Sequence, residues 1–495
     1  MRSCRVPLLA AVLALAPASG LAQTAPPPLL GTLPTTVAPA VTLPGAPPPP
    51  PADAANPAAP AAPIAAAVPA VPQLDPVNTG AVPPVPGTNP RVRPVPMIDS
   101  SDPAAGIVAG NALRRTADPN PYEPLGIRTG SFIWLPSVTL SGGYTTNATN
   151  SAGGKSSGFG IVAPELLINS DWSRHALSLA LRGSYTSFTR DDIPDDPTAE
   201  ATIAGRIDFA ERWTGDLGAY YRYAREGAGD PNAPAGADSP ADINRFGASA
   251  GLNGAWGWNV FTLATTVDRS LYGDTAFNGV SIDQSDRDNT VYGARLRVGY
   301  PLTGAITPFV EGIVTRRQYD DTVDDNGLRR SSTGSGVRVG VALDRGPVTT
   351  GEVAIGYLTE NYDDSALETL SAFTVDGSLV WAPTELVTVT TALATTIDPS
   401  TDPVSSGSVI YDGSVDLAYA WRTNAAVTLS GGVKSQQFEG LGRNDWTYRM
   451  GIGTTWSLNR NAELAAGYVH QWLDSTVAAN DYTSDTLRID LKLRH

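Results

Sequence analysis

Apolar and polar residues alternate one by one through most of the second part of this chain, and this period of two limits what it can fold into. Between Leu487 and Leu493, for example, aliphatic residues alternate with Arg488, Asp490 and Lys492. Successive side chains of a β-strand point to opposite faces, so each such segment has one apolar and one polar face. The pattern begins near residue 130 and predicts an all-β region that continues to the end of the chain.

The connections between these segments alternate between short turns and longer polar loops. Short turns are expected near 172–174, 211–214, 256–258, 300–304, 345–347, 382–385, 421–424 and 457–461, and longer loops near 147–157, 190–198, 226–242, 273–288, 320–330, 361–367, 398–407, 439–443 and 474–481. This rhythm is typical of a transmembrane antiparallel up-and-down β-barrel of about 18 strands (16–18). Nothing in the architecture of a soluble β-sandwich requires short turns and long loops to alternate. In such a barrel both ends of the strand region lie on the short-turn side, so both termini are expected in the periplasm.

The aromatic residues support a membrane barrel because they gather at the ends of the predicted strands. The tryptophans near the short turns are Trp134, Trp172, Trp213, Trp256, Trp258, Trp381, Trp421 and Trp456. The tyrosines near the longer loops include Tyr144, Tyr185, Tyr223, Tyr272, Tyr319, Tyr362 and Tyr411. Amphipathic rings favour the membrane–water interface, so we expect two aromatic girdles.

The polar face of the predicted strands carries charges that neither a dry core nor a lipid face would accept. The charged residues expected to face the lumen are Arg182, Arg206, Asp208, Arg222, Arg295, Arg297, Glu311, Arg338 and Arg449. A water-filled lumen accommodates them. Because arginines are more numerous than acids in this set, we expect anions to be attracted inside, against acidic outer loops, with weak net selectivity. Pro164 interrupts one predicted strand, and we expect a β-bulge there.

The N-terminal part has a different composition. Residues 1–22 have the basic start, short apolar run and small residues of a signal peptide. Residues 23–125 form a Pro/Ala-rich segment that we expect to be a disordered periplasmic linker, followed by the barrel at 126–495. Within it, 102–115 could form a short helix or a linker turn, and the weak periodicity favours the turn. The longest apolar run is too short for a transmembrane helix.

The chemistry-bearing residues do not form a recognisable catalytic site. The three histidines, His175, His470 and His495, fall at a turn, a rim and the end of the chain, and none groups with a nucleophile. We therefore expect no enzyme and no cofactor. The net charge of −15 and the lack of a basic stripe argue against a nucleic-acid partner. The weak candidates for a metal site are the loop carboxylates Asp320, Asp321, Asp324 and Asp325, for which a solvated loop is the favoured interpretation.

Two stretches resemble the putative β-barrel porin 2 family of proteobacterial outer-membrane proteins. They are 122–147, YEPLGIRTGSFIWLPSVTLSGGYTTN, and 162–183, VAPELLINSDWSRHALSLALRG, and the resemblance covers about 119–495. It implies an outer-membrane barrel without a catalytic signature. Some members are associated with exopolysaccharide production and export. The chain departs from many such barrels by ending in His495 rather than in an aromatic residue.

Three functions remain open from the sequence. The leading hypothesis is a passive, water-filled pore for small polar solutes. The alternatives are an outer-membrane pore or scaffold for exopolysaccharide export, and a structural barrel that tethers a periplasmic partner or peptidoglycan. The expected surroundings are outer-membrane lipid and lipopolysaccharide, with polysaccharide or peptidoglycan as further candidate partners. The sequence identifies neither the solute nor the oligomeric state.

Overall fold

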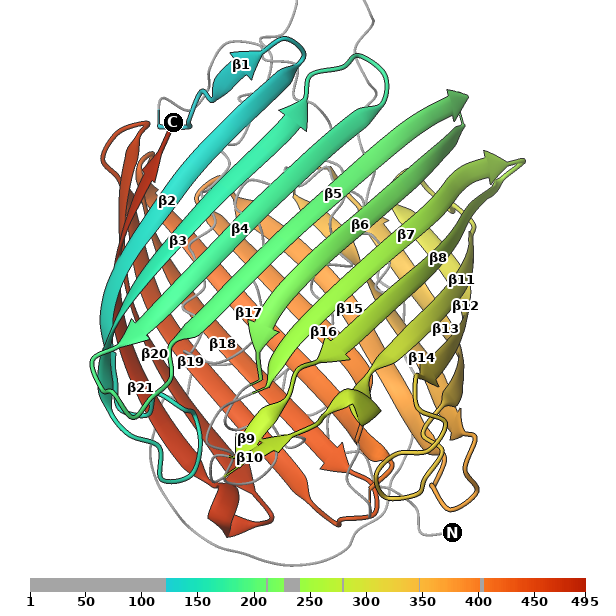
Figure 1. Ribbon diagram of the computed structural model, residues 1–495. Coiled ribbons are helices and arrows are strands. Elements are labelled where there is room, and N and C mark those ends of the chain that lie inside the picture. The colour runs from blue at the N-terminus through green and yellow to red at the C-terminus, as the bar shows by residue number, and fades with distance from the viewer. Residues whose placement is uncertain (1–121, 211, 227–240, 278–279, 347, 401–404) are drawn as a thin grey trace, which may run out of the picture. The chain divides into compact units, whose positions relative to one another are not determined.

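The computed structural model describes residues 122–210, 212–226, 241–277, 280–346, 348–400 and 405–495 (Figure 1). The predicted signal peptide at 1–22, the Pro/Ala-rich segment up to residue 121 and the candidate helix at 102–115 lie outside the described residues. None of the helices in the described ranges is long and apolar enough to span a membrane.

Eighteen of the described strands form one closed antiparallel barrel (Figure 1). They are β2 (Phe132–Thr145), β3 (Ser157–Ser170), β4 (Ala176–Phe188), β5 (Asp196–Ala210), β6 (Trp213–Arg225), β7 (Asp242–Trp256), β8 (Asn259–Tyr272), β11 (Asn289–Gly299), β12 (Ile306–Tyr319), β13 (Ser332–Asp344), β14 (Thr349–Tyr362), β15 (Leu370–Thr384), β16 (Val387–Pro399), β17 (Gly407–Arg422), β18 (Ala425–Phe438), β19 (Asn444–Ser457), β20 (Ala462–Ser475) and β21 (Tyr482–Arg494). Each strand pairs with the next in sequence, and β21 pairs with β2 to close the barrel. The predicted up-and-down barrel of about 18 strands is confirmed.

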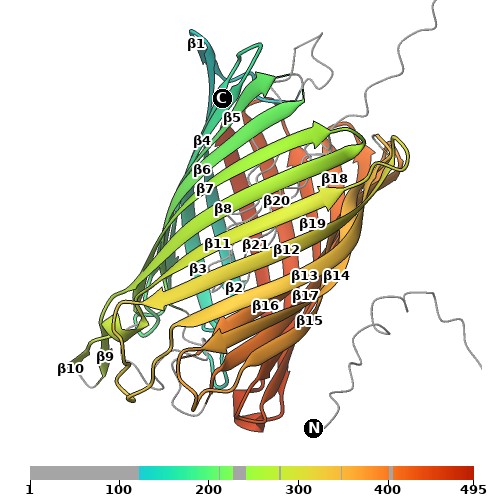
Figure 2. The ribbon, with the colours of Figure 1, turned by 90° about the vertical axis from the view of Figure 1, so that its right-hand side faces the viewer.

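The barrel has a short-turn end and a long-loop end, as the sequence rhythm predicts. Connections such as 257–258, 385–386 and 423–424 form the short-turn end, and 146–156 and 189–195 belong to the long-loop end. The strands run obliquely to the barrel axis (Figure 2), as closure of a sheet requires. Gly257 makes one two-residue turn possible because its φ of +62° lies in the left-handed region that glycine tolerates.

Five short elements of the described residues add to the eighteen barrel strands. β1 (Ile127–Thr129) pairs with the first residues of β2, where β21 no longer reaches. β9 (Thr275–Phe277) and β10 (Val280–Ile282) form a hairpin inside a stretch that the sequence predicted as loop. The 3-10 helices η3 (Ser285–Arg287) and η4 (Ala478–Asn480) lie in long-end loops. Such short strands escape a periodicity analysis because three residues contain too little alternation.

The bulge predicted at Pro164 is wrong. The β3–β4 register is the same on both sides of Pro164, from Val162↔Tyr185 to Glu165↔Arg182, and only the two intervening pairings are missing. Proline lacks the N–H that the ladder needs, but here the strand continues without an extra residue. The register shifts of β5–β6, β15–β16 and β17–β18 instead lie close to the short-turn end.

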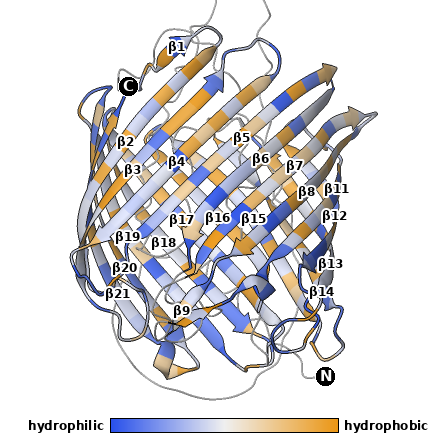
Figure 3. Cartoon of the chain, in the orientation of Figure 1, coloured by the Kyte–Doolittle hydropathy of each residue, from blue (hydrophilic) through white to orange (hydrophobic). Residues whose placement is uncertain are grey.

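The outward face of the barrel is apolar, and the alternation is visible along the strands in Figure 3. Exposed aliphatic residues with this orientation include Leu140, Leu217, Val310, Val337, Ile355 and Leu487. All eight predicted girdle tryptophans lie at the short-turn end, seven of them with exposed rings and Trp213 half-buried. The tyrosine girdle is only partly present. Tyr272, Tyr319 and Tyr362 have the opposite parity to the outward-facing residues of their strands, so the prediction is wrong for these three.

Candidate functional site

The inward face of β3 to β6 and β21 carries a line of ion pairs that we call the first charge row: Lys492, Glu165, Arg182, Glu200 and Arg222. The ladder places Glu165 opposite Arg182, Arg182 opposite Glu200, and Glu200 opposite Arg222. The N···O distances are 3.0 Å, 3.4 Å and 3.6 Å in that order. Alternating charges on neighbouring strands attract across the ladder, so this arrangement fixes both side chains of each pair.

A second charge row lies further along the wall, on β11 to β15, and consists of Arg295, Arg297, Glu311, Arg338, Glu352 and Asp376. Glu311 is its centre. It lies 2.7 Å from Arg297, 3.6 Å from Arg295 and 3.9 Å from Arg338. Arg297 also contacts Glu352 at 2.7 Å. Arg295 and Glu311 are only 2% and 1% exposed, so each charge depends on its partners to offset the loss of hydration.

The remaining predicted lumen charges lie apart from the two rows. Arg206 contacts Asp208 at 3.3 Å near the short-turn end, where Asp208 also accepts the backbone N–H of His175. Arg449 lies opposite Gly432 and Gln471, and forms no ion pair with another residue of the described part of the chain. The predicted lumen residues other than Arg449 therefore all belong to one of the two rows or to the Arg206–Asp208 pair.

The expectation that arginines outnumber acids on the inward face is wrong. Carboxylates that share the inward parity of their strands include Glu165, Glu200, Asp208, Asp216, Asp268, Glu311, Glu352, Glu360, Asp376, Asp412, Asp416 and Asp490. They are at least as numerous as the inward arginines. The lumen wall therefore presents paired charges of both signs rather than a net positive field.

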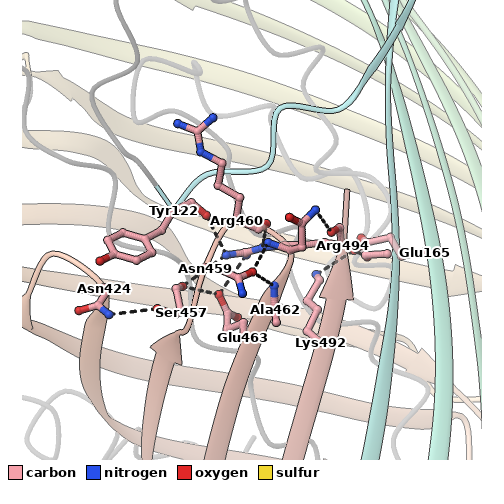
Figure 4. A network of polar contacts seen from close by, with 12 residues as sticks. Tyr122, Glu165, Asn424, Ser457, Asn459, Arg460, Ala462, Glu463, Lys492 and Arg494 are labelled. Atoms are coloured by element: carbon pink, nitrogen blue, oxygen red, sulfur yellow. Dashed lines mark hydrogen bonds and ion pairs between the residues drawn. The ribbon is translucent and has the colours of Figure 1, made fainter.

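A further inward cluster lies at the short-turn end, where the chain enters the barrel (Figure 4). Arg494 contacts Glu463 at 3.0 Å and donates a hydrogen bond of 3.1 Å to the backbone carbonyl of Tyr122. The side chain of Asn461 donates to the carbonyl of Arg494. These contacts join the last strand, the β19–β20 turn and the residues before β1, so they hold Tyr122 at the short-turn end.

Buried ion pairs also connect loops at the long-loop end. Arg287 contacts Glu226 at 2.5 Å, and thereby joins the β8–β11 and β6–β7 loops. Arg330 contacts Asp324 at 2.6 Å and donates hydrogen bonds to the carbonyls of Ser400 and Ser405. Because Arg330 belongs to the β12–β13 loop and Ser400 to the β16–β17 loop, this contact crosses the intervening strands β14 and β15. At the long-loop end, contacts between residues far apart in the sequence therefore hold the loops together.

Two carboxylates of the acidic 320–325 loop, Asp320 and Asp324, form ion pairs with arginines. Asp320 contacts Arg269 at 2.5 Å, and hydrogen bonding to that guanidinium lowers the pKa of Asp320. Burial alone would raise the pKa of Asp324, but hydrogen bonds from Arg330 and the backbone of Leu328 lower it below its ordinary value. Among the described residues, no three carboxylate, histidine or cysteine side chains converge as metal ligands, and Asp320, Asp321, Asp324 and Asp325 do not gather into one site.

Several residues of these clusters were missed by the sequence-based selection. Glu165, Glu200 and Lys492 complete the first charge row, and Asp376 completes the second. Their signal is the same parity within a strand that identified Arg182 and Glu311, so the alternation alone could have found them. The Arg287–Glu226 and Arg330–Asp324 pairs have no comparable signal, because loop contacts follow no periodicity.

The comparison with protein families agrees with this architecture. The family model described as Putative beta-barrel porin 2 matches residues 120–495. Among solved structures, the copper transporter OprC is 9% identical, with 75% of this chain and 81% of that chain covered and a TM-score of 0.44. A mutant of the ferric enterobactin receptor PfeA from Pseudomonas aeruginosa is also 9% identical, with 73% and 80% covered and a TM-score of 0.38. No curated protein sequence matches the chain.

Proposed function

Because the chain belongs to the putative β-barrel porin 2 family, and is thus an outer-membrane β-barrel of the porin type, we propose that it is a passive, water-filled pore for small polar solutes. The observation that carries this proposal is the continuous polar lining of the inward face, with its two charge rows. Barrels of 16–18 strands are wide enough to leave an aqueous channel. Charged side chains on the lumen wall need water or partners, and here they have partners as well as a polar surface around them.

The orientation in the membrane is part of this proposal. The short-turn end, with its tryptophans and with both Tyr122 and Arg494, faces the periplasm, and the long-loop end faces outward. Outer-membrane barrels have short periplasmic turns and long outer loops, which supports this assignment. The outward-facing ion pairs Arg269–Asp320 and Arg316–Asp363 lie at the long-loop end, where the apolar band stops and lipid headgroups would begin.

The paired charges support weak ion selectivity. In both rows each arginine has a carboxylate neighbour, so their fields cancel over short distances. We expect no catalytic activity, because the lining consists of ion pairs and hydroxyls rather than an activated nucleophile.

A single-channel measurement tests the proposal. The purified mature protein, reconstituted in a planar lipid bilayer, should conduct small ions, with a reversal potential near zero under a salt gradient. Liposomes that contain it should release small neutral sugars but retain large dextrans. A barrel that is folded, as judged by heat-modifiable migration in detergent, and that passes neither ions nor sugars would refute the pore.

A further inference from the structure

The lumen wall on β17 to β19 differs from the two charge rows, because its cationic side chains are not held in ion pairs. Lys434 of β18 and Arg449 of β19 are partly exposed, and neither side chain forms an ion pair or a hydrogen bond with another residue that the structure describes. In the two charge rows, by contrast, every arginine and lysine contacts at least one carboxylate. The charges of Lys434 and Arg449 therefore remain available to a solute.

The strand register places both cations on the lumen face and close to each other. Leu429 of β18 and Met450 of β19 are exposed on the outer face, and Lys434 and Arg449 have the opposite parity. Lys434 lies directly opposite Thr447, and Arg449 lies two residues further along the strand of Thr447. Diagonal neighbours of this kind are about 7–8 Å apart, within reach of long side chains. One small anion can therefore contact both cations.

The carboxylates of the neighbouring strand β17 do not neutralise these cations by contact. Asp412 lies directly opposite Lys434, but within the described part of the chain the two side chains form no ion pair. Asp416 lies opposite Ser430, which is four residues along β18 from Lys434. Like charges that are close neighbours on one face of a sheet repel each other. A bound anion would offset this repulsion.

The residues on both sides of Arg449 leave its guanidinium group without a partner. Gly432 lies directly opposite Arg449 on β18, and a Cβ atom added there would be 3.6 Å from its nearest neighbour, the carbonyl oxygen of Gly413. Gln471 lies opposite Arg449 on β20, and its side-chain amide donates to the Tyr482 hydroxyl at 2.5 Å. The wall therefore provides space beside the guanidinium group on one side and no acceptor for it on the other.

We propose that Lys434 and Arg449 form a binding site on the lumen wall for an oxyanion, the carboxylate or phosphate group of a small polar solute. The planar guanidinium group of Arg449 can donate two parallel hydrogen bonds to such a group, and the Lys434 ammonium adds a compact charge with three donors. The site deepens the proposed pore function, because it names the class of solute that the lumen retains. Its effect on transport rests on that function, whereas the binding itself does not.

Equilibrium binding tests the site without a membrane. The mature protein in detergent, at low ionic strength, is titrated with inorganic phosphate or with malonate and followed by isothermal titration calorimetry. We expect saturable binding of one anion per chain, which weakens as sodium chloride is added, and no binding of glycerol. Binding of only one of the two anions would identify its group as the ligand. If neither anion binds in a saturable way, the site is overturned.

Variants show whether the two cations are responsible for the binding. Arg449→Gln and Lys434→Gln should each weaken it at least about tenfold, because a hydrogen bond to a charged group is lost. Gly432→Asp keeps both cations but places a carboxylate opposite Arg449, and it should weaken binding by a similar factor. The control Lys155→Gln removes one positive charge from an exposed loop and should leave the affinity unchanged. Heat-modifiable migration checks that each variant is folded. Equal affinities in the first two variants and in the control would contradict the proposal.

The effect on transport is measured separately in planar bilayers. In chloride solution, the anion that binds in the calorimeter should lower the single-channel current of the unaltered protein in a saturable way, and Arg449→Gln should abolish this saturation. If the saturation persists in a variant whose measured affinity has fallen, the site lies off the conducting path, and its role in transport is refuted. A barrel without any conductance would refute the pore instead, while calorimetry still decides whether the anion site exists.

Discussion

Glu311 on β12 lies directly opposite Arg297 on β11, and the two side chains form an ion pair of 2.7 Å on the lumen wall. The same carboxylate lies opposite Arg338 on β13. Glu311 therefore lies beside one arginine on each neighbouring strand, and it also contacts Arg295 of β11. Its removal would leave three positive charges without their common partner.

We predict that Glu311→Gln destabilises the barrel and makes it more anion-selective. Breaking a buried ion pair by removing one partner costs about 3–5 kcal/mol, because the remaining charge stays buried without compensation. The midpoint of urea unfolding in detergent should fall, and the reversal potential under a salt gradient should move toward the anion value. The control is Glu385→Gln in an exposed short turn, which should change neither quantity. Unchanged selectivity in Glu311→Gln would mean that the second charge row does not line the conducting path.

A charge reversal tests how the second charge row affects ion selectivity, separately from how it affects the stability of the barrel. Arg295→Glu together with Arg297→Glu places new carboxylates beside Glu311 and Glu352, so the reversal potential should move toward cation preference. The swapped pair Arg297→Glu and Glu311→Arg keeps the net charge of the lumen, and its selectivity should stay close to that of the unaltered protein. If the swapped pair shifts the reversal potential as much as the double reversal, the positions of the charges in the row affect ion selectivity more than the net charge of the lumen does.

The strand arrangement could be predicted from the sequence because alternation and turn rhythm are local properties. The turn predicted near 256–258 and the loop predicted near 273–288 leave the strand that the structure shows as β8, Asn259–Tyr272. The partners of the lumen charges also follow from local properties once the order of strands is known, since each strand pairs with its neighbours in sequence. The packing of Leu370 and Ile397 into one buried cluster could not be predicted, because both segments have the alternation of ordinary paired strands. The positions of Tyr319 and Tyr362 along the chain suggest the outer aromatic girdle, but their parity within the strand directs both side chains inward.

The orientation in the membrane can be tested at two exposed glycines. Gly327 lies in the β12–β13 loop and Gly257 in the β7–β8 turn, both with positive φ and with open space where a side chain would begin. An epitope tag at Gly327 should bind antibody on intact cells. A tag at Gly257 should bind only after the outer membrane is made permeable. The reverse pattern would contradict the periplasmic position of the short turns.

The contact between Asp324 and Arg330 predicts a dependence on acidic pH. The pKa of Asp324 is lowered in the folded protein, so its contribution to stability is fully present above the ordinary value of 3.8 and is lost as the pH falls through the lowered pKa. Because Arg330 also holds the carbonyls of Ser400 and Ser405, the noise of the open channel should rise as the pH is taken from about 5 to below about 3. Asp324→Asn should be noisy already at neutral pH and should respond less to acid. Identical pH profiles would show that another group is responsible.

The last prediction concerns the N-terminal segment, which we expect to act as a tether. The barrel itself does not need this segment in order to close. The ladder closes between β2 and β21 from Ser137↔Arg494 to Thr145↔Thr486, entirely within the region after residue 131. Deletion of 23–121 should therefore leave a barrel that resists heat in detergent and conducts as before.

A deletion that extends to Thr129 also removes β1, and exposes the edge of β2 at Phe132–Trp134 that β1 covers. It also removes the carbonyl of Tyr122 that Arg494 binds. This longer deletion should lower the temperature at which the barrel unfolds on heating before electrophoresis, because an uncovered strand edge loses its hydrogen bonds. If the shorter deletion alone prevents folding, residues before 122 take part in forming the barrel.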